Sequence, residues 1–273
     1  MRIVRAPRML MTIFFFNLVL AMVGITSIAA IMNRTSSLSN MDYSTVVRVY
    51  ELLALVDGFL VIVMMPTLTA GGICHEREKN TFDTLYVSGI SASSIIMGKL
   101  MAALSIVMTI VVSTLPLLSL AFVFGGIRYL TLIAMVAILF VHAAYIGSMS
   151  LAFSAYAKTI TFSITGSYAA IICTSVGTVV MCYLFNAVGM GFRWLYYILL
   201  FNPAYTLVVF IFRQVGDDRA VSFLHRFCGL PDSGFVIDNW SAVSISVQLI
   251  VTAALIIIAM SGISIYPRRC RNK

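Results

Sequence analysis

Seven long apolar runs, separated by short polar segments, dominate the sequence. They cover residues 10–32, 52–73, 99–123, 130–153, 161–185, 193–212 and 242–266. These lengths reach the roughly 20 residues that a helix needs to cross about 30 Å of hydrocarbon. Strands of a membrane barrel would instead appear as short segments of alternating hydrophobicity. The runs therefore predict an all-α integral membrane protein.

The composition supports this class, because 61% of the 273 residues are hydrophobic and only 10% are charged. Soluble domains usually carry about a quarter charged residues. The polar segments leave no room for a soluble catalytic or ATPase domain. The run 10–32 is too long for the apolar core of a signal peptide, so we interpret it as a retained first span.

Basic residues at both ends of the chain predict the topology. Three arginines lie within the first eight residues and four basic residues within the last six. Because basic residues are held on the cytoplasmic side, both termini are expected there, and the number of spans must be even. The run 193–212 is the poorest span, since Asn202-Pro203 interrupts it. We therefore predict six transmembrane helices.

With six spans, 11 of the 18 basic residues and 3 of the 10 acidic residues lie on the cytoplasmic side. The whole net charge of +8 then falls on that face. Such an asymmetry is an orientation signal, and it accounts for the basic balance without a nucleic-acid partner. The longest external segment, 186–241, contains the run 193–212. This segment is predicted to be re-entrant or interfacial. This segment either caps the outer opening of the substrate pathway or lies in the membrane–water interface, away from any substrate.

The densest run of mixed charge is the polar interruption at residues 74–99, CHEREKNTFDTLYVSGISASSIIMGK. It separates the second span from the third, so it lies at the membrane surface, on the cytoplasmic side. Its Gly98-Lys99-Leu100 end lacks the upstream glycine and the Ser or Thr of a phosphate-binding loop, so we expect this chain not to bind nucleotide. Lys99 fits better as an interfacial anchor.

We expect no enzyme activity and no metal site in this chain. The five cysteines form no CxxC pair and have no neighbouring histidine cluster, so neither a metal centre nor a disulfide framework is predicted. Two ionisable residues lie within predicted spans, Asp57 and His142. Such residues often mark a substrate or proton pathway. The simpler alternatives are that Asp57 reaches the outer interface and that His142 packs against a neighbouring helix.

Within the polar interruption, one stretch resembles a known family. Its residues are Glu76-Arg77-Glu78-Lys79-Asn80-Thr81-Phe82-Asp83-Thr84-Leu85, followed by Ile95-Ile96-Met97-Gly98-Lys99-Leu100. The stretch is similar to the ERExGT-x-x-x-L run and the GKL entry to the third span of ABC-2-type transporter permeases. It departs from that pattern at Asn80, where Gly is usual, and at Gly89, where Pro is common. The six-span layout with a long last external segment also resembles this family.

The resemblance implies the membrane subunit of an exporter in a bacterial plasma membrane. Such a subunit pairs with a second permease copy, identical or closely related, and binds two separate cytoplasmic ABC ATPases that hold the ATP and magnesium. The segment 74–98 would be the coupling helix that enters a groove of the ATPase. The predicted coupling residues are Glu76, Arg77, Glu78, Lys79, Thr81, Phe82, Leu85 and Tyr86.

Helical spacing gives these residues a physical role. If Glu76 to Tyr86 is helical, then Phe82, Leu85 and Tyr86 share one face and form an apolar ridge. The charges at 76–79 would set orientation and partner choice. Alternatively the ridge rests on lipid. The expected cargo is hydrophobic or amphipathic, with an antimicrobial or cytolytic peptide favoured. The rival function is an ion-gradient-driven carrier or channel that uses Asp57 or His142.

Overall fold

The computed structural model describes residues 5–32, 43–78, 91–123, 128–189, 195–230 and 234–264. These residues form helices and no strands, which confirms the all-α prediction. The α-helices are α1 (Arg5–Met32), α2 (Tyr43–Thr69), α3 (Cys74–Glu78), α5 (Ala92–Val123), α6 (Tyr129–Tyr156), α7 (Ile160–Ile172), α8 (Thr178–Ala187), α9 (Pro203–Val215), α10 (Asp218–Phe227), α11 (Phe235–Asp238) and α12 (Trp240–Ser264). A π-helix, η2 (Cys173–Gly177), joins α7 to α8, and a 3₁₀-helix, η3 (Leu195–Phe201), precedes α9.

Five helical stretches within these ranges are long and apolar enough to cross a membrane. They are Val47–Glu78, Ala92–Ser119, Tyr129–Tyr156, Ile160–Ala187 and Trp240–Ile263. Two shorter apolar helical stretches, Ile13–Ser27 and Pro203–Val215, lie in α1 and α9. The chain is therefore a multi-pass α-helical membrane protein.

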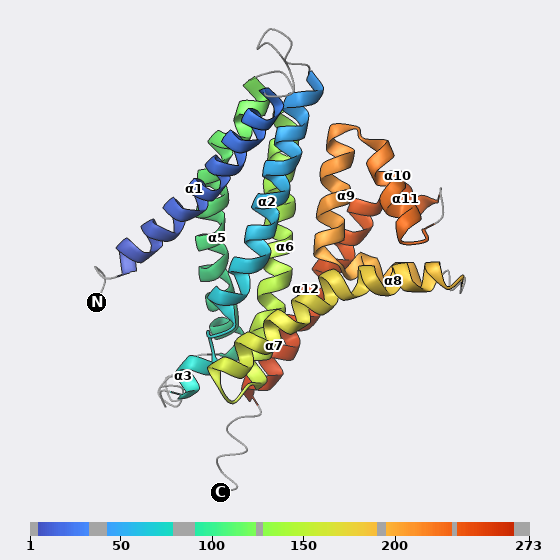
Figure 1. Ribbon diagram of the computed structural model, residues 1–273. Helices are drawn as coiled ribbons and strands as arrows, with labels where there is room; N and C mark the ends of the chain where they lie inside the picture. The colour runs from blue at the N-terminus through green and yellow to red at the C-terminus, as the bar shows by residue number, and fades with distance from the viewer. Residues whose placement is uncertain are drawn as a thin grey trace, which may run out of the picture.

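Helices α2, α5 and α6 form the centre of a bundle, with α1 and α12 packed outside them (Figure 1). Their buried apolar side chains make one continuous core. Gly147 of α6 lets its neighbours approach closely, because a Cβ there would lie 2.4 Å from Met65 Cε and 3.0 Å from Leu100 Cδ1. Small residues at such contacts are typical of helices that pack in lipid.

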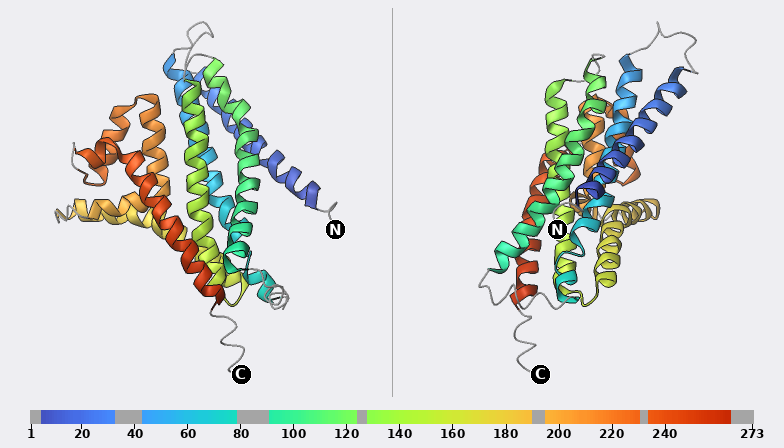
Figure 2. Two further views of the ribbon diagram at one scale, coloured as in Figure 1. Left: turned by 180° about the vertical axis from the view of Figure 1, so that it is seen from behind. Right: turned by 90° about the vertical axis from the view of Figure 1, so that its left-hand side faces the viewer.

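One end of the bundle, which we call the α3 end, gathers the termini of many helices. Helices α2, α6 and α12 run toward it and α5 and α7 run away from it, and α3 lies beside them (Figures 1 and 2). Helix α5 begins at Ala92, so the last residues of the predicted coupling segment 74–98 are the first two turns of a long helix. The α3 end is therefore where the polar interruption meets the bundle.

The helix that covers the predicted fifth span is bent. In Figure 1, α7 rises along the bundle and α8 turns away from it to run below α9, α10 and α11, with the π-helix between α7 and α8. Asn202 fixes this bend, because its Nδ2 donates to Ser175 O at 2.7 Å and to Thr178 Oγ1 at 2.8 Å. The side-chain oxygen of Asn202 also accepts from Tyr205 N at 2.9 Å and so caps α9. The Asn202-Pro203 interruption is thus a helix start.

Helices α8 to α11 and η3 form a second group, the lobe, beside the bundle (Figures 1 and 2). The lobe and the start of α12 share an apolar cluster, in which Leu199 of η3 and Trp240 of α12 are fully buried. Tyr205 and Trp240 meet edge to face with ring centroids 5.5 Å apart. Arg213 of α9 donates to the carbonyls of Ile237 and Asp238, at the end of α11. The predicted external segment 186–241 therefore includes a packed helical unit.

Candidate functional site

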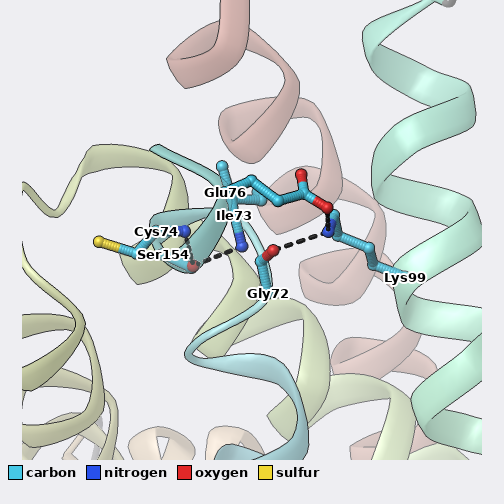
Figure 3. Close-up of polar contacts among 6 residues, drawn as sticks. All are labelled: Gly72, Ile73, Cys74, Glu76, Lys99 and Ser154. Carbon is cyan, nitrogen blue, oxygen red and sulfur yellow. Dashed lines mark hydrogen bonds and ion pairs between the residues drawn. The ribbon is translucent and has the colours of Figure 1, made fainter. Parts of the chain in front are cut away.

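The chain turns sharply between α2 and α3, and a side chain from α6 holds that turn. Ser154 Oγ accepts hydrogen bonds from Ile73 N at 3.0 Å and from Cys74 N at 3.1 Å (Figure 3). All three residues are buried, with exposed fractions of 0%. The N–H groups that begin a helix have no partner within it, and Ser154 satisfies two of them. The hydroxyl of Ser163 in α7 adds a bond to Ala70 O at 2.6 Å.

Lys99, near the start of α5, binds the same corner. Its Nζ lies 2.6 Å from Glu76 Oε1 and donates to Gly72 O at 2.7 Å (Figure 3). About a quarter of each charged side chain is exposed, so solvent screens the pair. The predicted interfacial anchor therefore has a specific partner, and Glu76 is directed at α5.

Arg77 reaches two other helices. Its Nη1 donates to Ala155 O at 2.6 Å and its Nη2 to Gly262 O at 3.3 Å. These carbonyls belong to the last turns of α6 and α12. The carbonyl ends of helices carry partial negative charge, and the planar guanidinium fork can bind two acceptors at once. One arginine therefore joins α3 to the ends of two long helices.

Glu78 binds the start of α7. Its Oε1 accepts from Ile160 N at 2.8 Å, and Ile160 is the first residue of that helix. Thr159 caps the same turn through Phe162 N at 3.4 Å. A carboxylate at a helix N-terminus satisfies an unpaired N–H and interacts favourably with the helix dipole. The three charged residues of α3 thus bind α5, α6, α7 and α12.

This arrangement can transmit a displacement. A push on α3 acts on the helix ends to which Glu76, Arg77 and Glu78 are bonded, because packed helices shift as units. The coupling role of these three residues stays a prediction. The other predicted coupling residues lie outside the described residues. They are Lys79, Thr81, Phe82, Leu85 and Tyr86.

Sequence reasoning did not find the partners of the α3 charges. Two of them, Ala155 O and Gly262 O, are backbone carbonyls of small residues with no side-chain signature. Ser154 directly follows the fourth apolar run, 130–153, which itself contains Ser148 and Ser150. The only signal for Ser154 is that small polar residues often bond between helices in lipid.

The two ionisable residues of the predicted pathway lie in the middle of the bundle. Asp57 of α2 is fully buried, and its Oδ2 lies 3.3 Å from Thr114 Oγ1 of α5. Its Oδ1 has no hydrogen-bond partner among the described residues. Its carboxyl group is packed against α5, and the depth of Asp57 relative to the outer interface stays a prediction.

His142 of α6 is 2% exposed, and neither ring nitrogen has a hydrogen-bond partner in the described part of the chain. It is packed, as the simpler alternative predicted, but the structure gives it no bond to a neighbouring helix. Asp57 and His142 lie on helices that pack against each other, and their side chains do not bond each other. Among the described residues, no group of three His, Cys, Asp or Glu could hold a metal ion.

No protein-family model matches this chain, and a search of curated proteins gives no match either.

Proposed function

We propose that this chain is the membrane subunit of an ATP-driven ABC-2-type exporter. A separate ATPase subunit would supply the energy for transport. One observation carries the proposal. The charged triplet Glu76-Arg77-Glu78, at the start of the stretch that resembles ABC-2 permeases, bonds α3 to α5, α6, α7 and α12. A segment that is fixed to four helices at one end of a bundle suits a receiver of force.

The proposed topology has six spans, with the α3 end and both termini in the cytoplasm of a bacterial cell. Helix α1 would be the sixth span, because its 28 residues extend about 42 Å at about 1.5 Å per residue. That length exceeds the roughly 30 Å of a bilayer core. Lys99 and Lys158 then lie on the cytoplasmic side, as the bias of basic residues favours.

The ATPase would dock on the residues that follow α3. Phe82, Leu85 and Tyr86 would enter its groove, while Lys79 and Thr81 would contact its rim. The α3 triplet would then pass the movement to the bundle. Two ATPases would serve a pair of permease copies, identical or closely related, and would hold the ATP and magnesium.

The proposed cargo is hydrophobic or amphipathic, and an antimicrobial or cytolytic peptide is favoured. Helices α5 and α6 border a groove of about 840 Å³, lined almost entirely by apolar side chains such as Leu115, Ile133 and Phe140. Such a lining suits a hydrocarbon surface and offers an ion few ligands. The peptide preference rests on this chemistry and on the absence of charged residues facing the groove among those described.

The second candidate is an ion-gradient-driven carrier, which the unpartnered Oδ1 of buried Asp57 favours. An ionisable group that is buried at membrane depth is a frequent coupling site. In that case the purified chain alone would transport, and Asp57→Asn would abolish transport. In the ABC-2 proposal, transport requires the ATPase, and Asp57→Asn leaves it largely unchanged.

The test is reconstitution of the full chain, with and without its co-purifying ATPase, into lipid vesicles. Uptake of a fluorescent amphipathic helical peptide is measured with Mg-ATP, with a proton gradient, or with a sodium gradient. We expect uptake only with the ATPase and Mg-ATP. Gradient-driven uptake by the chain alone would refute the proposal and support the carrier.

A further inference from the structure

Two cysteines that are far apart in the sequence lie in one seam of the lobe. Cys182 belongs to α8, and Cys228 directly follows the last residue of α10. Both are free thiols in the structure, their exposed fractions are 3% and 4%, and both belong to the same apolar cluster. Nothing in their sequence spacing indicates a pair.

Contacts between residues close to the two cysteines hold α8 against the end of α10. The rings of Tyr183 and Phe227, which adjoin the two cysteines, stack with centroids 4.4 Å apart and planes 15° apart. Asn186 Nδ2 donates to Arg226 O at 3.0 Å. Because Cys182 precedes Asn186 by one helical turn, both lie on the face of α8 that meets α10.

The chain beyond Cys228 also lies close to α8. Gly229 adopts φ +74°, and a Cβ there would lie 3.0 Å from Asn186 Cγ. Residues 226, 227 and 229 all contact α8, so Cys228 is held between contacting neighbours. The other described cysteines lie elsewhere: Cys74 donates to Ala157 O at 3.5 Å, and Cys173 is exposed on η2.

We propose that Cys182 and Cys228 form a disulfide bond in the mature protein, which ties α8 to the end of α10. The inference rests on the outward placement of the lobe in the proposed function, because disulfides persist outside the reducing cytosol. The bond would close residues 183–227 into a loop and hold the α9–α10 hairpin against α8. It would restrict the unfolded ensemble and so slow the opening of the lobe.

The chemistry is thiol–disulfide exchange with a disulfide donor, such as an extracytoplasmic oxidoreductase or oxidised glutathione. One cysteine thiolate attacks the donor disulfide and releases one donor thiolate. The second cysteine thiolate then attacks the mixed disulfide and releases the other donor thiolate. The two cysteines lose two electrons to the donor, and their two protons end on the donor thiols.

The burial of both thiols also bears on when this exchange occurs. Burial, with a smaller effect of Cys182, raises the pKa of the Cys228 thiol to about 12. The thiolate is the attacking species, so a folded lobe reacts slowly. We therefore expect the bond to form while the chain is inserted and folded, and an oxidant added afterwards to change little.

The experiment uses the full chain made in its native membrane. Free thiols are blocked with iodoacetamide in denaturant at harvest, and peptides are then mapped by mass spectrometry without reduction. We expect a linked peptide pair containing Cys182 and Cys228, lighter by two hydrogen atoms than the two thiol peptides together. Iodoacetamide adducts on both cysteines in most molecules would overturn the proposal.

Matched variants identify the bond. Cys182→Ser and Cys228→Ser should each lose the linked pair and gain an adduct on the remaining cysteine, whereas Cys173→Ser should keep the pair. Adducts on Cys228 that are unchanged by Cys182→Ser would also overturn it. The result is independent of ATPase docking, which is tested at the α3 end. A failed docking test with an intact disulfide would refute only the proposed function.

Discussion

The α3 end and the middle of the bundle differ in whether their polar side chains have hydrogen-bond partners among the described residues. At the α3 end, Glu76, Arg77 and Glu78 each bond a different part of the bundle. In the middle, Asp57 Oδ1 and both nitrogens of His142 are buried and have no partner among the described residues. A bonded polar group stabilises the fold, whereas a buried group without a partner costs free energy. Substitutions in the two regions should therefore have effects of opposite sign.

The largest effect is expected from Arg77→Ala. It removes two charge-assisted bonds to the ends of α6 and α12, and such bonds contribute about 1.5 kcal/mol or more each. We expect a loss of about 3 kcal/mol in unfolding free energy. Thermal unfolding in detergent, followed by tryptophan fluorescence, measures it. The control is Arg128→Ala, an exposed arginine at the start of α6, which should leave the midpoint unchanged.

Ser154→Ala should have the second largest effect and lower the free energy of unfolding by about 2 kcal/mol. The substitution leaves the buried N–H groups of Ile73 and Cys74 without their acceptor. Ser150→Ala is a matched control. Ser150 is equally buried one turn earlier in α6, but among the described residues it bonds only Ile146 O of its own helix, at 3.0 Å. Equal losses in the two variants would show that the α2–α3 turn does not depend on Ser154.

His142→Leu should raise the free energy of unfolding, by about 1 kcal/mol. The substitution introduces an apolar side chain of similar size and removes two buried nitrogens that have no partner among the described residues. We expect a higher midpoint of thermal unfolding and unchanged ATP-driven uptake. A lower midpoint would mean that His142 has a bonding role, and the contrast between the two regions would then fail.

The smallest effect is expected from the ion pair between Glu76 and Lys99, because both side chains are partly exposed. Exposed pairs contribute less than about 1 kcal/mol. Glu76→Lys and Lys99→Glu should each lower the midpoint slightly, and the double exchange should recover most of the loss at low salt. No recovery in the double variant would indicate that Lys99 acts through Gly72 O alone.

The sequence predicted the helical membrane class because long apolar runs have few alternatives in lipid. It also located the polar interruption, whose charges cannot lie in hydrocarbon. It did not show where α2 begins, because the helix starts at Tyr43, well before the apolar run at 52. Asp57 is therefore fourteen residues into its helix, about 21 Å along the axis. A periodic apolar pattern does not show how far a helix continues into polar residues.

The tertiary partners could not be predicted. The acceptors of Arg77 are carbonyls, which every residue carries. The bend at η2 depends on Asn202 reaching Ser175 O, a contact between residues 27 apart in sequence. The seam between Cys182 and Cys228 depends in turn on that bend and on the packing of the lobe. Each of these features follows from the arrangement of helices and has no local signature.

The most direct test of the account compares two variants in one assay, after purification of the chain with its ATPase from native membranes. The amount of bound ATPase and the peptide transported per ATP hydrolysed are measured together. Phe82→Ala/Leu85→Ala should lose the ATPase. Arg77→Ala should keep it and hydrolyse ATP, but should transport several-fold less peptide per ATP. If the double variant retains the ATPase, or if Arg77→Ala transports as the unchanged chain does, the proposed role of the α3 end is contradicted.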